Sequence, residues 1–282
     1  YSDANEAAMK RVVDFCKSVG DSKIAVQLAH AGRKASAERP WEGGNALKEG
    51  AWQTYGPSAI AFADGWHVPE ALDDAGLARI KDAFVAAAKR AVRLGIDAIE
   101  LHAAHGYLLH QFLSPISNQR SDHYGGSLEN RMRFPLELFS AVKAVVPADM
   151  PVLVRVSASD WVDGGWHVDG TIAFAKALEA AGCAAMHVSS GGNSLAQKLE
   201  IGYGYQTDLA KQIRDAVDMP VIAVGMITEP LQAETIIRTG QADMVALARE
   251  FLRDPHWTWR AAKALRSTSS VPNQYARAVS FS

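Results

Sequence analysis

Short apolar segments alternate with amphipathic helices along most of the chain, and this alternation constrains the fold more than any other feature. The hydrophobic pattern predicts strands over residues 24–29, 98–102, 152–157, 185–189, 221–224 and 244–247. It predicts helices over residues 4–19, 77–94, 128–145, 170–181, 207–217 and 230–239, with a further helical region from residue 255. Strict alternation of this kind predicts the α/β class, with helices covering a parallel sheet.

The number of strands narrows the architecture further. A closed βα barrel needs eight parallel strands, whereas this chain supplies six and starts on a helix. We therefore expect residues 1–282 to form a single (β/α)8 TIM barrel domain that lacks its first two strands in this chain. The missing β–α–β segment would have about 60–80 residues. No G-x-G-x-x-G follows a strand, which argues against a Rossmann domain.

Composition excludes several classes of partner and site. The net charge of −2 offers no electrostatic footprint for nucleic acid or an anionic membrane, and no run of 18 uncharged apolar residues is present. The first residues do not resemble a signal peptide. Cys16 and Cys183, the two cysteines, cannot build a cysteine-ligated zinc or iron–sulfur site. We expect a cytoplasmic protein with a small-molecule ligand, no nucleic-acid or membrane partner, and no metal.

The strand over residues 98–102 leads into a loop rich in hydrogen-bonding side chains. Side chains alternate along a strand, so Ile99 and Leu101 are expected to face the helices, and His102 to face the interior. His105 and Tyr107 follow within five residues. Active sites of βα barrels lie at the carboxyl ends of the strands. This loop is therefore a candidate site with hydrogen-bond donors and a possible proton donor.

Two other strands place polar side chains in the same interior. Gln27 and Arg155 each have the inward parity of their strand. A buried arginine is rare unless it is paired, so Arg155 needs an anion. Two candidates remain open: Glu100 on the neighbouring strand, or an anionic cofactor.

The last two strands end in segments suited to binding phosphate. The first runs into Gly225, where the backbone can approach a ligand closely, and the second runs into Ala248 and Arg249. Loops after the last two strands of such barrels frequently bind phosphate through backbone N–H groups. An arginine there would add a bidentate donor.

Several motifs together resemble the old yellow enzyme family of flavin-dependent ene-reductases, and most of all its bacterial subclass that contains the xenobiotic reductases. The matching segments are residues 26–33 (VQLAHAGR), 102–109 (HAAHGYLL), 111–115 (QFLSP), 118–120 (NQR) and 124–131 (YGGSLENR). The likeness runs nearly the whole length of the chain. It implies a (β/α)8 barrel that holds FMN at the carboxyl ends of its strands and is reduced by NADPH or NADH. The family's Pro-Met-Cys-type segment, which contacts the flavin, has no counterpart here.

The resemblance also assigns roles in binding the cofactor. It implies that Gln27 and Arg155 hydrogen-bond the polar edge of the flavin ring. It implies that Gly225 and the pair Ala248 and Arg249 hold the flavin phosphate.

For the substrate, the resemblance implies that His102 and His105 bind the carbonyl oxygen of an α,β-unsaturated compound and that Tyr107 protonates its α-carbon. Such enzymes reduce the C=C bond of enones and enals, and the resemblance extends this to nitro or xenobiotic compounds. The tail Gln274-Tyr275-Ala276-Arg277 resembles a segment that reaches across a dimer interface. It implies a homodimer or higher homo-oligomer in which Arg277 serves the neighbouring active site.

Two other functions remain open. One is a barrel enzyme of another class, an aldolase or isomerase acting on a phosphorylated substrate. A Schiff-base aldolase needs a lysine at a strand end, and none of the predicted strands contains one. The other is a truncated barrel without catalytic activity.

Overall fold

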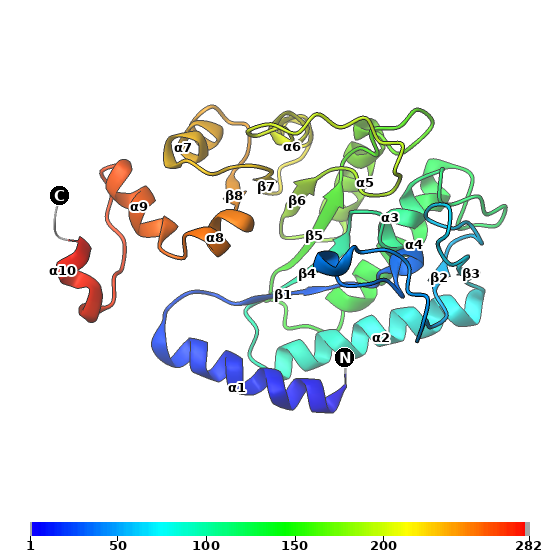
Figure 1. The fold of residues 1–282 in the computed structure, drawn as a ribbon, viewed down its shortest axis with the longest axis horizontal. Coiled ribbons are helices and arrows are strands. Elements are labelled where there is room, and N and C mark those ends of the chain that lie inside the picture. Colours follow the sequence, from blue (N-terminus) through cyan, green and yellow to red (C-terminus); the bar gives the residue numbers. More distant parts are fainter. Residues whose placement is uncertain (1, 280–282) are drawn as a thin grey trace.

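The computed structural model describes residues 2–279, and its centre is a six-stranded sheet (Figure 1). Every pairing in this sheet is parallel, in the order β1-β4-β5-β6-β7-β8. The strands are β1 (Ala25–Leu28), β4 (Ala98–Ala103), β5 (Val152–Ser157), β6 (Met186–Ser189), β7 (Val221–Val224) and β8 (Met244–Ala246). All six predicted strands are confirmed. β1 and β8 are the two edges of the curled sheet, which matches the barrel architecture with six strands present.

The predicted helices are also present, with ends shifted by a few residues. They are α1 (Asp3–Val19), α2 (Asp74–Arg93), α4 (Leu128–Lys143), α5 (Val168–Ala180), α6 (Thr207–Arg214) and α7 (Pro230–Arg238). The helical region after residue 255 is α9 (Trp257–Ala264), and α8 (Arg249–Arg253) precedes it. The end of α2 has a local cause, because Gly95 takes φ +73° just past the helix, where a side chain would be strained. Among the described residues, no helix is long and apolar enough to cross a bilayer.

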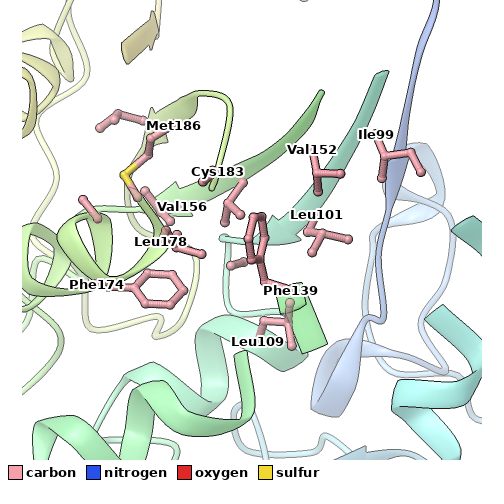
Figure 2. Packing of buried hydrophobic residues seen from close by; sticks show 14 of the residues in the cluster. Ile99, Leu101, Leu109, Phe139, Val152, Val156, Phe174, Leu178, Cys183 and Met186 are labelled. Carbon is pink, nitrogen blue, oxygen red and sulfur yellow. The ribbon is translucent and has the colours of Figure 1, made fainter. Parts of the chain in front are cut away.

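The hydrophobic core lies between the sheet and these helices. Figure 2 shows side chains of β4 and β5 meeting Phe139 of α4 and Leu178 of α5. Ile99 is fully buried and Leu101 nearly so, as their parity predicted. Burying one such side chain contributes about 1.5–3 kcal/mol, so this face fixes which residues turn inward.

Some elements were not predicted. No helix or strand was predicted between residues 29 and 77, but this segment contains η1 (Gly32–Lys34), η2 (Pro40–Glu42) and β2 (Tyr55–Gly56), which pairs in parallel with β3 (Glu70–Ala71). The short helix α3 (Leu108–Leu113) follows the histidine loop directly. At the carboxyl end, η3 (Asn273–Tyr275) leads into α10 (Ala276–Val279).

The register of the parallel strands aligns the inward polar residues in layers. His102, Arg155 and His187 are aligned across β4, β5 and β6. Gln27 is aligned with Glu100 one layer below. The carboxyl ends of parallel strands meet at one edge of a sheet, so these side chains converge there.

Candidate active site at the carboxyl ends of the strands

A cavity of about 460 Å³ opens at the carboxyl ends of β5 to β8. This volume lies within the range of small-molecule sites, roughly 300–1,000 Å³. Its lining includes Arg155, Gly225, Ala248 and Arg249, all four of which the sequence predicted as ligand-binding residues, together with His105. Five separately predicted positions therefore come together around one cavity.

Arg155 brings an unpaired positive charge to this cavity. Its Nε atom is buried and has no hydrogen-bond partner. Among the described residues, no carboxylate lies within ion-pair distance of its guanidinium. Burial lowers the pKa of Arg155, although the more distant charge of Glu100 acts in the opposite direction. Of the two anions left open by the sequence, the structure does not bring Glu100 into contact, and the cavity leaves room for an anionic ligand.

Glu100 contacts other residues instead. Its two carboxylate oxygens lie 2.6 Å from Gln27 Nε2 and 2.9 Å from His187 Nδ1. Burial would raise the pKa of Glu100, but the hydrogen bond and charge of His187 outweigh it and lower the pKa. An ionised carboxylate only accepts hydrogen bonds, so the Gln27 amide must present its nitrogen to Glu100. The Gln27 oxygen is left as an acceptor, on the exposed edge strand β1 and outside the lining of the 460 Å³ cavity.

The backbone of Gly225 lies very close to neighbouring side chains. Its φ is +125°, and a Cβ atom there would lie 2.6 Å from Gln206 Nε2. Any side chain would therefore clash and would also be strained. Ala248 and Arg249 line the cavity beside it, at the start of α8. Gly225, Ala248 and Arg249 therefore lie around one part of the cavity, and the phosphate site that the sequence placed at them stays a prediction.

His102, His105 and Tyr107 form a tight cluster. The ring centroid of His102 lies 5.1 Å from that of His105 and 5.1 Å from that of Tyr107. His105 Nε2 lies 2.8 Å from Ser189 Oγ, whereas His102 Nδ1 is buried without a partner. The three side chains singled out by the sequence are thus within reach of one small ligand group.

Both histidines are uncharged at neutral pH. Burial, and then the nearby charge of Arg155, lower the pKa of His102 to about 4 and that of His105 to about 2. Neutral imidazoles retain one N–H each. The cluster can therefore donate hydrogen bonds to an oxygen on which negative charge develops, without a permanent charge of its own.

These lowered pKa values predict how stability depends on pH. The unfolded chain binds protons at the two histidines below about pH 6.5, while the folded chain does not until the pH is much lower. We expect the free energy of unfolding of the FMN-free protein to fall by about 2 kcal/mol for each histidine between about pH 7.5 and pH 5. Urea titrations at the two pH values measure this fall. In His102→Asn or His105→Asn the unfolding free energy should fall less between these two pH values. A fall as large as that of the parent protein would contradict a lowered pKa of the replaced histidine.

The loop that carries the cluster is held by residues that sequence reasoning missed. Lys34 Nζ donates to the carbonyl of His105 at 3.0 Å and to that of Gly192 at 2.8 Å. Ser157 Oγ accepts the N–H of His105 at 2.9 Å. Burial, and then the charge of Arg33, lower the pKa of Lys34 to about 8. Its place beside Arg33 in the motif over residues 26–33 was the one available signal.

Arg277 is not brought to the cluster of its own chain. It is exposed on α10. Figure 1 places α10 at the far end of the molecule, well away from β4 and α3.

Comparisons with known proteins find relatives that match nearly the whole chain. The model of the "NADH:flavin oxidoreductase / NADH oxidase family" matches residues 1–268. An NADPH dehydrogenase of Bacillus subtilis (strain 168) is 42% identical over 277 residues, covering 98% of this chain and 77% of the relative. The structure of morphinone reductase aligns with a TM-score of 0.74 at 28% identity, covering 97% of this chain and 73% of that one. An old yellow enzyme homologue from Zymomonas mobilis aligns with a TM-score of 0.74 at 25% identity, covering 98% and 76%.

The comparisons confirm the family resemblance and set aside the alternative of a phosphorylated-substrate aldolase or isomerase. The chain belongs to the NADH:flavin oxidoreductase / NADH oxidase family, that of the old yellow enzymes, and is an oxidoreductase with FMN as its cofactor and NADPH or NADH as its reductant.

Proposed function

We propose that this protein reduces the C=C bond of α,β-unsaturated carbonyl compounds, the enones and enals. The observation that carries the proposal is the cluster of two neutral histidines and a tyrosine beside the ligand cavity. Reduction of an enone builds negative charge on the carbonyl oxygen and then needs a proton at the α-carbon. This cluster supplies two donors and one acid of suitable kinds.

The residues that line the cavity, together with Gln27 outside that lining, fit FMN. The unpaired guanidinium of Arg155 and the free oxygen of Gln27 are a donor and an acceptor, which together complement the imide edge of the flavin ring. Gly225 provides a backbone cradle, and Ala248 and Arg249 lie beside it at the same cavity. In this proposal the first pair holds the ring and the second group holds the phosphate.

The chain's own residues then carry the proton and the charge. When bound, FMN supplies the hydride that adds to the β-carbon of the substrate. His102 and His105 donate hydrogen bonds to the carbonyl oxygen, which stabilises the enolate where it forms. Tyr107 gives its phenolic proton to the α-carbon, and solvent restores that proton afterwards.

Steady-state turnover tests the proposal. FMN-loaded protein with NADPH and 2-cyclohexen-1-one, without oxygen, should form cyclohexanone in the amount of NADPH consumed. Consumption of NADPH without cyclohexanone would refute the proposed substrate class. Neither NADPH oxidation nor product formation would be the result expected of a barrel without activity.

Tyr107→Phe should lower turnover of 2-cyclohexen-1-one while leaving its binding intact. General acid catalysis contributes typically 10²–10⁴-fold, and water can partly replace the phenol, so we expect a loss of roughly tenfold or more. Stopped-flow reoxidation of reduced enzyme measures the step. Full activity of the variant across the pH range would exclude Tyr107 as the acid. Tyr203→Phe, on an exposed side chain outside the cavity, is the matched control.

We infer further that the protein is a homodimer in which Arg277 lies at the active site of the other copy. Exposure of Arg277 and the position of α10, far from its own histidine cluster, support this inference. A planar guanidinium suits contact with a polar ligand edge. Arg277→Ala should raise the KM for the enone severalfold while the dimer persists in sedimentation, and Arg11→Ala on α1 is the control. A fully active monomer would contradict the inference.

A further inference from the structure

A buried histidine–aspartate pair lies beneath the histidine loop. His110 is on α3, and Asp160 lies in the segment between β5 and α5. Both side chains are completely shielded from solvent, and His110 Nε2 lies 3.0 Å from Asp160 Oδ1. Neither of these atoms has a hydrogen-bond partner elsewhere among the described residues. A buried pair of this kind is expensive to desolvate, so its presence calls for a role.

His110 also holds the backbone of the loop. Its Nδ1 accepts the N–H of Gly106 at 2.9 Å, and Gln111 Nε2 donates to the carbonyl of Gly106 at 2.7 Å. Because Nδ1 accepts, the ring proton resides on Nε2, which faces Asp160. Gly106 is the residue between His105 and Tyr107. Both peptide groups that join the two site residues are therefore fixed by α3.

Asp160 is a permanent acceptor for that ring proton. Its Oδ2 accepts hydrogen bonds from Ser114 Oγ at 2.5 Å and from the N–H of Trp166 at 2.8 Å. Burial would raise its pKa, but the contact with His110 and these hydrogen bonds lower the pKa to about 2. The carboxylate therefore stays ionised and keeps His110 in one tautomer.

The loop needs such support because its backbone is strained. His105 has φ +57° and Gly106 has φ +71°, so two successive residues are left-handed. A residue with a side chain adopts this conformation only where its surroundings impose it. Gly106 also packs tightly, since a Cβ atom there would lie 2.3 Å from the carbonyl oxygen of Gly192.

We propose that His110 and Asp160 are a positioning pair that sets the left-handed turn at Gly106 and thereby aims His105 and Tyr107 at the substrate. Neither residue lines the cavity, and both side chains are completely shielded from solvent, so in this proposal the pair acts through the loop. The proposal rests on the proposed function, and it adds two residues to which no role had been assigned. Asp160 acts only through His110, by fixing which ring nitrogen can accept from Gly106.

Two substitutions at His110 separate its two contacts. His110→Asn keeps an acceptor oxygen at the position of Nδ1, for Gly106, and withdraws from Asp160. His110→Gln places its amide near the position of Nε2, for Asp160, and leaves Gly106 without an acceptor. His167→Gln, at an exposed histidine that begins α5, is the matched control. The readouts on FMN-loaded protein are the affinity for phenol, kcat and KM for 2-cyclohexen-1-one, and FMN affinity.

We expect His110→Gln to weaken phenol binding and to lower kcat/KM by about tenfold or more, the effect of one lost buried hydrogen bond. His110→Asn should stay within a few-fold of the parent, and FMN affinity should change little in either variant. Equal losses in both variants, or parallel losses of phenol and FMN affinity, would mean that the pair only stabilises the fold and would overturn the proposal. So would full activity of His110→Gln.

The outcome is separable from that of the proposed function. A parent protein that binds phenol but does not reduce the enone refutes the function, while the phenol affinities of the variants still decide the positioning role. If His110→Gln fails to fold, Asp160→Asn takes its place. It keeps the side-chain volume but no longer fixes the tautomer, so phenol binding should weaken in that variant too, and unchanged phenol binding would overturn the proposal.

Discussion

Replacing either His102 or His105 with alanine is expected to lower kcat/KM for 2-cyclohexen-1-one by about 10²–10³-fold. This is the typical loss when one donor is removed from a developing oxyanion. Both rings are desolvated and neutral, so each supplies an N–H where water cannot replace it. The double variant should lose less than the product of the two single losses, because the rings contact one another and, in the proposed function, donate to one oxygen.

Stopped-flow kinetics locate the loss. Reoxidation of reduced enzyme by the enone should slow by the full factor, and reduction by NADPH should slow less. His67→Ala, whose ring contacts the carbonyl of Leu47 in the long segment before α2, is the control and should leave both half-reactions unchanged. Normal enone turnover in both single variants would place the substrate site elsewhere.

Arg155→Met should weaken FMN binding by about 10–100-fold, because a hydrogen bond to a charged group contributes about 1.5–3 kcal/mol. Arg155 lines the cavity and its guanidinium has no carboxylate within ion-pair distance among the described residues, so we propose the cofactor as its partner. The FMN affinity of Arg155→Lys should lie between those of the parent protein and Arg155→Met. An ammonium keeps the positive charge but lacks the planar pair of N–H donors of a guanidinium.

Fluorescence titration of the FMN-free protein with FMN measures the affinity. Arg214→Met removes a surface arginine that pairs with Asp243, and it is the matched control. Unchanged FMN affinity and an unchanged rate of flavin reduction in Arg155→Met would reject the assignment of Arg155 to the cofactor.

The strands and the main helices were predictable because their signal is local. Alternation along β4 and β5 fixes which residues face the helices, and the structure buries Ile99, Leu101, Val152 and Val154 as expected. The helix α3 was not predicted because all six of its side chains are buried, so its sequence has no amphipathic periodicity. β2 and β3 have two residues each, too few for any periodic pattern.

Site residues could be predicted where the residue type and its position on one face of a strand are enough. Contacts with residues distant in sequence were harder to predict. His102 lies near the end of β4, and His105 and Tyr107 follow within five residues, so their clustering follows from their closeness in sequence. The choice between Glu100 and a cofactor for Arg155 depended on distances across the sheet, and only the structure shows that Glu100 instead contacts Gln27. Lys34 reaches a loop that is 158 positions away along the chain, so its role has no local signature.

A single anaerobic turnover tests the central claim most directly. FMN-loaded protein is first reduced with NADPH until the flavin absorbance near about 450 nm disappears. An equal amount of 2-cyclohexen-1-one is then added. The account predicts that this absorbance returns and that cyclohexanone forms in the amount of flavin reoxidised. Flavin that stays reduced, or that is reoxidised without cyclohexanone, would contradict it.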